Sequence, residues 1–308
     1  MEGLRSGKLD YDRPIKVAEN IYWMGAREPA DKWMINPYLI VDQGEAILVD
    51  AGSGMDFTSL VMKIVQIGIA PSAIKALIYQ NYDPRLWGSL QYLEAIINRK
   101  DLKIISDRSS LVFGQHHAVE AALLSLEDVE FQVKFSSGRS LELIKTPFAG
   151  SSGSFVTFDR KSGILFSGHL FSSYSCEGEP FLELMAECSD CKSIAICPYS
   201  HGCCPVHDIV KFHRDNISSE RALKYALECI ASVPFRTIAP QQGSVIRGAE
   251  DIAHLSALLA SLKGVGIDGI VGRSLLLRTG GYHVGERWIE RRARAGHGNL
   301  ERSRIVHR

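Results

Sequence analysis

A polar loop between two apolar runs decides the fold of this chain, and it reads Gln80-Asn81-Tyr82-Asp83-Pro84-Arg85-Leu86-Trp87-Gly88-Ser89-Leu90. The preceding run, Ile74 to Tyr79, is short and mostly apolar, which predicts a buried strand. The following run, Leu86 to Ile97, has apolar residues at helical spacing and predicts one helix. The loop therefore joins a strand to a helix, and its polar side chains are the first candidates for a functional site.

Three later segments place a short polar or glycine-containing loop after a strand-like run. They are Thr146-Pro147-Phe148-Ala149-Gly150, Leu165-Phe166-Ser167-Gly168-His169 and Ile238-Ala239-Pro240-Gln241-Gln242-Gly243-Ser244. In this order the four segments resemble the metal-binding loops of the metallo-β-lactamase fold, and within it those of the flavodiiron and oxygen-binding diiron proteins. The resemblance covers about residues 10–248 and includes Asp50-Ala51-Gly52-Ser53, because that family places Asp-x-Gly after its second hairpin strand.

The resemblance implies an α+β fold, the four-layer αβ/βα sandwich in which two sheets pack face to face with helices outside. We expect this domain at residues 1–262, with a Cys-rich insertion at about residues 176–204 and a basic C-terminal arm at residues 263–308. The family has His-x-Glu/Asp-x-Asp in the first loop, then His, Asp and His in the later loops. At these positions this chain has Asn81, Asp83, Arg85, Gly150, His169 and Gln242.

Only Asp83 keeps the chemical type that the resembled metal site requires. Amides such as Asn81 and Gln242 offer weak ligands for iron or zinc, and Gly150 offers no side chain. We therefore expect a degenerate pocket without the standard diiron pair. Such a pocket lacks the activated bridging hydroxide that hydrolysis of a β-lactam or thioester by the usual route requires, and it lacks a site for reducing oxygen.

Arg85 is the most consequential departure from the family pattern, because its guanidinium stays protonated and repels a nearby cation. One interpretation pairs Arg85 with Asp83, so that the guanidinium stands where the cation would stand. The other turns Arg85 to solvent and leaves Asp83 as the cap of the helix that begins near Leu86. His169 replaces a bridging Asp, and it either holds one metal ion or only makes hydrogen bonds in the pocket.

Six of the seven cysteines lie within 29 residues: Cys176, Cys188, Cys191, Cys197, Cys203 and Cys204. His201 and His207 are close by in the sequence, and Pro198 and Pro205 favour an irregular loop over a helix. Thiolates and imidazoles in such a loop suit an iron–sulfur cluster or zinc, which is the cofactor that we expect here. The alternative is that several of these thiols are buried small hydrophobic side chains.

Charge and hydropathy exclude several classes of partner. The chain has 35 basic and 35 acidic side chains, so no whole-molecule field attracts nucleic acid. Residues 1–14 lack an apolar signal-peptide core, and no apolar run approaches the roughly 20 residues that span a bilayer. We therefore expect a cytoplasmic protein that binds neither nucleic acid nor membrane.

The C-terminal arm differs in charge from the rest of the chain. Residues 273–308 hold nine Arg and three Glu, a local net charge of +6, which leaves −6 for the preceding part. The arm also contains Leu275, Leu276, Leu277 and Trp288, which solvated tails usually lack. We expect residues 273–289 to pack on the domain or on a second copy, so that the arm mediates self-association or contact with a protein partner.

Periodicity predicts further elements along the chain. Residues 119–126 are expected to be helical, and residues 218–231 form a helix with Ser218 as its N-cap. The segment Phe212-His213-Arg214-Asp215-Asn216 matches a helix that follows the third loop in the resembled family, and we expect it to pack at the pocket mouth.

Three functions fit these observations. The first is a non-catalytic or catalytically altered redox or ligand sensor, or a regulatory module, related to the oxygen-binding diiron proteins. The second is an active metalloenzyme, an oxidoreductase or hydrolase, that uses His169 together with His201, His207 or His213 as rearranged ligands. The third is a ligand-free protein-binding module. The metal content of the purified protein distinguishes these functions.

Overall fold

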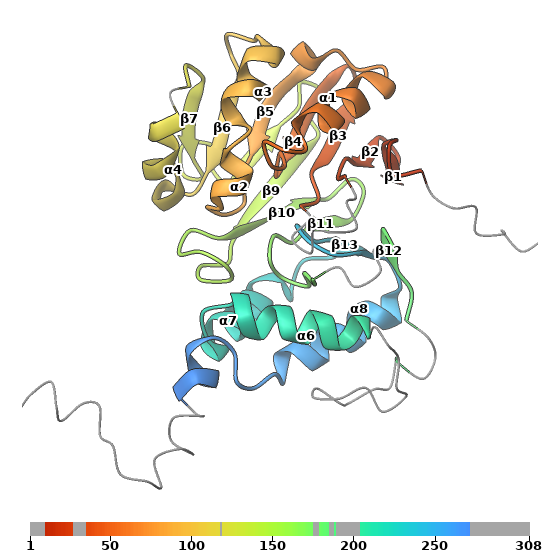
Figure 1. The fold of residues 1–308 in the computed structure, drawn as a ribbon, viewed down its shortest axis with the longest axis vertical. Coiled ribbons are helices and arrows are strands. Elements are labelled where there is room, and N and C mark those ends of the chain that lie inside the picture. The colour runs from red at the N-terminus through yellow and green to blue at the C-terminus, as the bar shows by residue number, and fades with distance from the viewer. Residues whose placement is uncertain are drawn as a thin grey trace, which may run out of the picture.

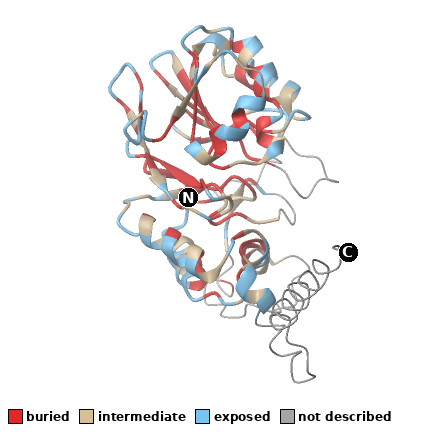
Figure 2. Ribbon diagram, turned by 90° about the vertical axis from the view of Figure 1, so that its left-hand side faces the viewer, coloured by how far each residue is buried: buried red, intermediate tan, exposed pale blue. Residues whose placement is uncertain are grey.

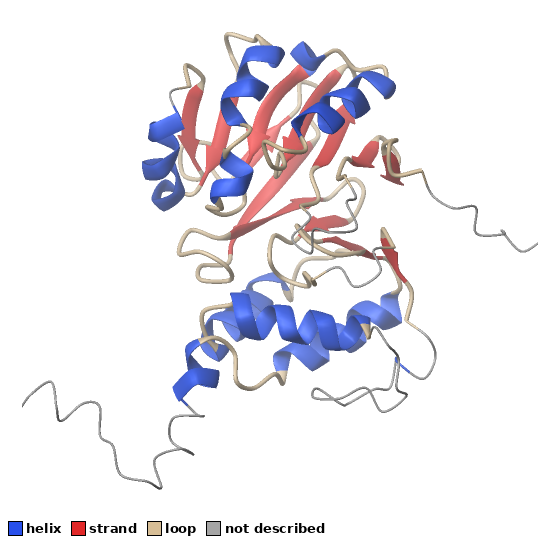
Figure 3. Cartoon of the chain, in the orientation of Figure 1, coloured by secondary structure: helices blue, strands red, loops and turns tan. Residues whose placement is uncertain are grey.

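The computed structural model describes residues 10–26, 35–117, 119–174, 179–184, 188 and 204–271. Two sheets face each other in this part of the chain (Figures 1 and 3). The first sheet takes its strands in chain order: β1 (Ile15–Ala18), β2 (Ile21–Trp23), β3 (Tyr38–Asp42), β4 (Glu45–Val49), β5 (Ile74–Ile78), β6 (Lys103–Ser106) and β7 (Ala122–Ser125). Strands β1 to β4 pair antiparallel, and β4 to β7 pair parallel.

The second sheet has the strand order β12-β14-β13-β11-β10-β9-β8. Its strands are β8 (Gln132–Lys134), β9 (Ser140–Lys145), β10 (Phe155–Asp159), β11 (Ile164–Phe166), β12 (Phe181–Leu182), β13 (Thr237–Ala239) and β14 (Val245–Ile246). Strands β8 to β11 pair antiparallel, and β13 joins β11 in parallel. The sheet therefore combines a meander with strands from the later half of the chain.

Helices cover the outer face of each sheet (Figure 1). Helices α1 (Phe57–Gln66), α2 (Pro84–Trp87), α3 (Leu90–Ile97) and α4 (Arg108–Gly114) lie on the first sheet, with the short 3-10 turns Pro71–Ala73 and Gln115–His117. Helices α6 (Pro205–Asn216), α7 (Glu220–Ile230) and α8 (Ala249–Ala260) lie on the second. None of the helices in the described part of the chain has the length and apolar character needed to cross a membrane.

Apolar side chains fill the spaces between the four layers, and Figure 2 shows the buried residues concentrated on the strands and the helix faces turned toward them. One cluster lies between the sheets and includes Tyr38 and Phe166, whose ring centroids are 5.3 Å apart. A second joins the second sheet to α6, α7 and α8, and a third joins the first sheet to α1, α2 and α3. The expected αβ/βα sandwich is confirmed.

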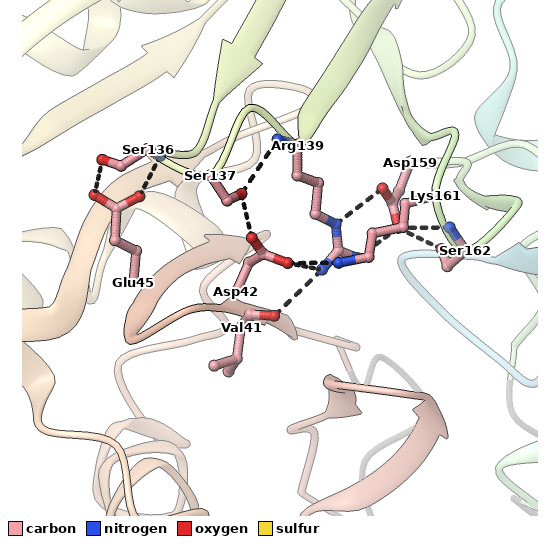
Figure 4. Close-up of polar contacts among 9 residues, drawn as sticks. All are labelled: Val41, Asp42, Glu45, Ser136, Ser137, Arg139, Asp159, Lys161 and Ser162. Carbon is pink, nitrogen blue, oxygen red and sulfur yellow. Dashed lines mark hydrogen bonds and ion pairs between the residues drawn. The ribbon is translucent and has the colours of Figure 1, made fainter.

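A buried arginine ties the two sheets together (Figure 4). Arg139, just before β9, donates to both carboxylate oxygens of Asp159 at 3.1 and 2.6 Å. It also contacts Asp42 of β3 at 3.4 Å and donates to the Val41 carbonyl at 3.2 Å. Lys161 adds a second cation to Asp42 at 2.9 Å. Since Asp42 and Asp159 belong to different sheets, Arg139 joins them through charge-assisted hydrogen bonds.

Three local expectations differ from the structure. Residues 122–125 form strand β7 instead of a helix, because they pair in parallel with β6 at the sheet edge. The expected helix over residues 86–97 breaks into α2 and α3, where Ser89 donates to the Gly52 carbonyl at 2.9 Å. Ser219, and not Ser218, caps α7 by accepting a hydrogen bond from the Ala222 amide at 3.1 Å.

The packed region continues past Leu262, which was the domain boundary expected from the sequence. Val265 is fully buried in the cluster under α6, α7 and α8. The expected behaviour of the arm at residues 273–308 falls outside the described residues.

Candidate functional site

The four loops quoted from the sequence meet at one edge of the sandwich. They follow β5, β9, β11 and β13. The Gln241 amide donates to the Gly168 carbonyl at 2.9 Å, and the Gln241 side chain exchanges hydrogen bonds with Asn81, so the fourth loop is tied to the third and the first. The sequence elements expected to form one cleft therefore converge.

Several residues in these loops hold strained backbone conformations. Asp50, Phe148 and Phe171 all have positive φ angles, of 51°, 64° and 60°. Non-glycine residues rarely adopt this region, and they persist there only when the surrounding structure holds them in place. These three residues lie at or beside the loops, while Asn20, Gln43, Asn98, Glu130 and Phe131 hold positive φ angles elsewhere in the described residues.

Asp83 and Arg85 form an ion pair inside the first loop. The Arg85 Nε lies 3.0 and 3.1 Å from the two carboxylate oxygens of Asp83, and Nη2 makes a further contact. The Asp83 side chain is 13% exposed and that of Arg85 is 38% exposed. Burial alone would raise the pKa of Asp83, but the hydrogen bonds and charge of Arg85 hold that pKa below its ordinary value.

Asp83 also caps helix α2, because its carboxylate accepts a hydrogen bond from the Arg85 amide at 2.9 Å. The two interpretations left open by the sequence are therefore combined in one arrangement. The backbone amide fixes the carboxylate at the helix start, and the guanidinium then closes on it.

Asn81 pairs with Gln241, a residue that the sequence analysis did not single out. Their side-chain amides exchange hydrogen bonds of 3.1 and 3.3 Å, and both side chains are buried. The neighbouring Gln242, which was expected to occupy the fourth ligand position, accepts at its carbonyl from the Ser173 amide at 3.3 Å. The Gln242 side-chain nitrogen is buried without a hydrogen-bond partner among the described residues. Gln241 and Gln242 are adjacent, and the sequence does not indicate which of the two side chains faces Asn81.

His169 occupies the space that a side chain at position 150 would need. A Cβ atom built on Gly150 would lie 2.4 Å from His169 Nδ1, and Gly150 has a φ of +132°. The Nδ1 atom is buried without a hydrogen-bond partner in the described part of the chain. Burial lowers the pKa of His169 to about 4, so the imidazole is neutral at physiological pH.

Asp50 is buried and contacts Gln80 at the start of the first loop. Its carboxylate accepts hydrogen bonds from the Gln80 amide at 3.0 Å and from the Gln80 side chain at 2.8 Å. Gln241 also interacts with this carboxylate. Burial nevertheless raises the pKa of Asp50 to about 6. Asp50 therefore orders the first and fourth loops.

The sequence of this chain matches the model of a known protein family over more than half of its length. The family described as ODP family beta lactamase matches residues 34–243. The chain belongs to the ODP family. No curated protein sequence matches it.

Two solved structures resemble this ODP-family chain over nearly their full lengths. The peroxy diiron species of a chemotaxis sensor ODP is 21% identical, with a TM-score of 0.66 over 84% of this chain and 98% of that one. The apo state of the chemotaxis sensor ODP from T. denticola is 20% identical, with a TM-score of 0.64 over 84% and 97%. Rubredoxin oxygen:oxidoreductase from the anaerobe Desulfovibrio gigas is 16% identical, with a TM-score of 0.64, over 80% of this chain and 60% of that one.

The residues that meet where these four loops converge do not fit a dinuclear iron centre. The carboxylate of Asp83 is engaged by Arg85, and the amides of Asn81 and Gln241 satisfy each other. Within the described ranges, no three or more His, Cys, Asp or Glu side chains gather closely enough to hold a metal ion. His169 is the one pocket side chain of the predicted set with a nitrogen suited to a metal.

The thiol-based cofactor stays a prediction. Cys176, Cys191, Cys197, Cys203 and His201 lie outside the described residues. Cys188 is buried, and the Cys204 sulfur accepts a hydrogen bond from the His207 amide at 3.5 Å at the start of α6. The Cys204 side chain therefore contributes a helix cap, a structural role that the sequence analysis did not foresee.

Proposed function

We propose that this chain is a sensory or regulatory member of the ODP family whose pocket works without a dinuclear metal centre. The similarity to proteins described as chemotaxis sensors supports the sensory role. The pairing of Asp83 with Arg85 carries the proposal of a metal-independent pocket.

The electrostatics of that pair oppose metal binding. A guanidinium cannot lose its proton in a protein, so displacing it requires a cation to compete for a carboxylate that already has a bidentate partner. If Arg85 stays in the loop, its charge repels the incoming ion across a partly desolvated site. Both effects lower the affinity for iron or zinc at this position.

The remaining side chains supply little catalytic chemistry. Asn81 and Gln241 neither give nor take protons at ordinary pH, and Asp83 is held as a paired carboxylate. His169 is neutral, and its Nδ1 is buried without a hydrogen-bond partner among the described residues, so nothing described there orients the imidazole as a general base. A non-catalytic role in ligand or redox sensing therefore fits this pocket better than turnover.

The metalloenzyme with rearranged ligands is less well supported. His213 was one of its candidate ligands, but both ring nitrogens already hold hydrogen bonds inside the protein. One accepts from the Phe171 amide at 2.9 Å, and the other donates to the Ile209 carbonyl at 2.7 Å. A metal at His213 would break one of these buried contacts, at a cost comparable to an unsatisfied buried group.

Elemental analysis of the purified full-length protein, with an assay for acid-labile sulfide, separates the metalloenzyme from the proposed function. The sensory role through the thiols predicts iron with labile sulfide, or zinc, that is lost in Cys188→Ser, Cys191→Ser or Cys197→Ser. No metal leaves a small-molecule sensor or a binding module. Two equivalents of iron or zinc without sulfide, lost in Asp83→Ala, contradict the proposal and support the metalloenzyme.

A further inference from the structure

Helix α6 contacts the pocket directly. Phe212 packs edge-to-face against His169, with ring centroids 5.5 Å apart and planes at 82°. The next residue, His213, is fully buried, and its Nε2 accepts from the amide of Phe171, the strained residue two positions after His169. Any movement of the His169 loop would therefore displace the side chains of Phe212 and His213 on α6.

Residues 217–219 link α6 to α7, and together with Glu220, the first residue of α7, they are called the connector. Its Ser218 amide donates to the Phe148 carbonyl at 3.3 Å. Phe148 lies two residues before Gly150, on the loop against which His169 packs. The connector thus contacts the second pocket loop while α6 contacts the third.

The connector also holds the segment Lys263–Asp268, called the C-terminal turn. The Gly266 amide donates to the Arg214 carbonyl at the end of α6 at 2.9 Å, and the Ile267 amide donates to the Ser218 carbonyl at 3.1 Å. Ser218 therefore binds the pocket loop through its amide and the C-terminal turn through its carbonyl.

Glu220 and Asp268 add a second set of bonds at the same place. The Glu220 amide donates to Asp268 Oδ2 at 2.7 Å, and the Glu220 carboxylate accepts from the Gly264 amide at 2.9 Å. Lys263 pairs with the same carboxylate at 2.9 Å. The C-terminal turn, which is the first segment of the arm expected at residues 263–308, is therefore bonded to both the backbone and the side chain of Glu220.

Gly266 fits this contact because it lacks a side chain. A Cβ atom there would lie 2.3 Å from the carbonyl oxygens of Ile217 and Ser218, and the residue has a φ of +53°. Gly264 has a similar φ of +70°, but the nearest atom to its Cβ would be 3.7 Å away. The two glycines share the backbone strain, and only Gly266 is packed against the connector.

We propose that the connector couples the pocket to the C-terminal turn, so that a displacement of His169 loosens the turn and alters the root of the C-terminal arm. This inference rests on the proposed sensory function, because it names the contacts through which a change at His169 would reach the C-terminal arm. The two states are the seated and the loosened turn, and the contacts through Phe212, His213 and Ser218 join them to His169.

Hydrogen exchange on the full-length protein tests the coupling. In Gly150→Ala the new methyl must displace His169, and we expect peptides containing the Gly266 and Ile267 amides to exchange about 5- to 150-fold faster, the range of ordinary allosteric coupling. Gly138→Ala is the control, since Gly138 has a φ of +92° but no atom within 4 Å of its Cβ position. Rates are compared after correction for each variant's global unfolding free energy.

Coupling free energies are reciprocal, so the experiment also runs in the other direction. Gly266→Ala should shift the imidazole NMR signals of His169, and Gly138→Ala, which lies outside the coupled segments, should leave them in place. If Gly150→Ala fails to fold, His169→Ala replaces it with the same expected exchange.

The coupling is overturned if the Gly266 and Ile267 amides exchange at the same rate in Gly150→Ala as in the wild type. It is also overturned if Gly266→Ala leaves the His169 signals unchanged. Neither result depends on metal content, which decides the proposed function separately.

Discussion

At the scale of single residues, the pairing of Asp83 with Arg85 makes a stability prediction. Arg85→Ala leaves the half-buried carboxylate with only its cap bond, and we expect it to lower the free energy of unfolding by about 1 kcal/mol, the upper end for partly exposed pairs. Urea denaturation measures the loss. The control is Arg13→Ala, which breaks an Arg–Asp pair whose side chains are 76% and 57% exposed. Equal losses in the two variants would contradict the partial burial of the pocket pair.

Asp50 makes a prediction about pH. Burial raises its pKa to about 6 in the folded protein, from an ordinary value of 3.8. Between these values the folded state holds more protons than the unfolded state, so this group makes the protein less stable as the pH rises from about 4 to 6. Asp50→Asn does not titrate. Its stability relative to the wild type should rise by roughly 2–3 kcal/mol across that window, as measured by urea denaturation at pH 4.5, 5.5 and 7. Parallel stability curves would rule out the raised pKa.

Sequence reasoning reached some of these residues and missed others for identifiable reasons. The Asp83–Arg85 contact was predictable because it is local, with two residues of opposite charge on one loop. The contact between Gly150 and His169 was not, since it depends on how two loops from different strands meet. Gln241 was missed because the choice between it and Gln242 depends on a side-chain direction that no local pattern encodes.

At the scale of elements, Arg139 should be the strongest single tie between the sheets. Arg139→Ala would take from buried Asp159 its arginine partner and leave Asp42 with Lys161 alone, and we expect a loss of about 3 kcal/mol in the free energy of unfolding. The control is Arg160→Ala, which removes an arginine that is 64% exposed and should cost at most ~1 kcal/mol. Chemical denaturation of both variants gives the comparison. A small loss in Arg139→Ala would mean that the sheets hold together through the apolar core alone.

Most strands and helices were predictable because apolar periodicity reflects burial on one face. Helix α1 follows that pattern, whereas strands β3, β4 and β6 are short apolar runs that are buried at nearly every position. Strand β7 was predicted as a helix because Ala and Leu favour helices locally, but its hydrogen bonds to β6 override that preference. Pairing of this kind joins residues about twenty positions apart, which a local window does not contain.

At the scale of the whole molecule, the C-terminal arm remains a prediction. Its apolar residues, such as Trp288, should bury against the domain or a second copy, while its arginines meet acidic groups at the rim. Deleting residues 273–308 should therefore lower the melting temperature or change the mass in solution. A shorter deletion of residues 291–308 should do neither. An unchanged melting temperature and mass after the long deletion would show that the arm is dispensable.

The central claim is that the guanidinium of Arg85 stands in place of a metal in this ODP-family pocket, and iron binding by two variants tests it most directly. The first is the full-length protein with Cys188→Ser, Cys191→Ser and Cys197→Ser, which removes thiol ligands. The second adds Asn81→His, Arg85→Asp, Gly150→His, His169→Asp and Gln242→His, which restore the ligand types of the resembled family. After anaerobic loading with ferrous iron and desalting, we expect no retained iron in the first protein and a retained pair in the second. Two equivalents of iron in the first protein, lost on Asp83→Ala, would contradict the account.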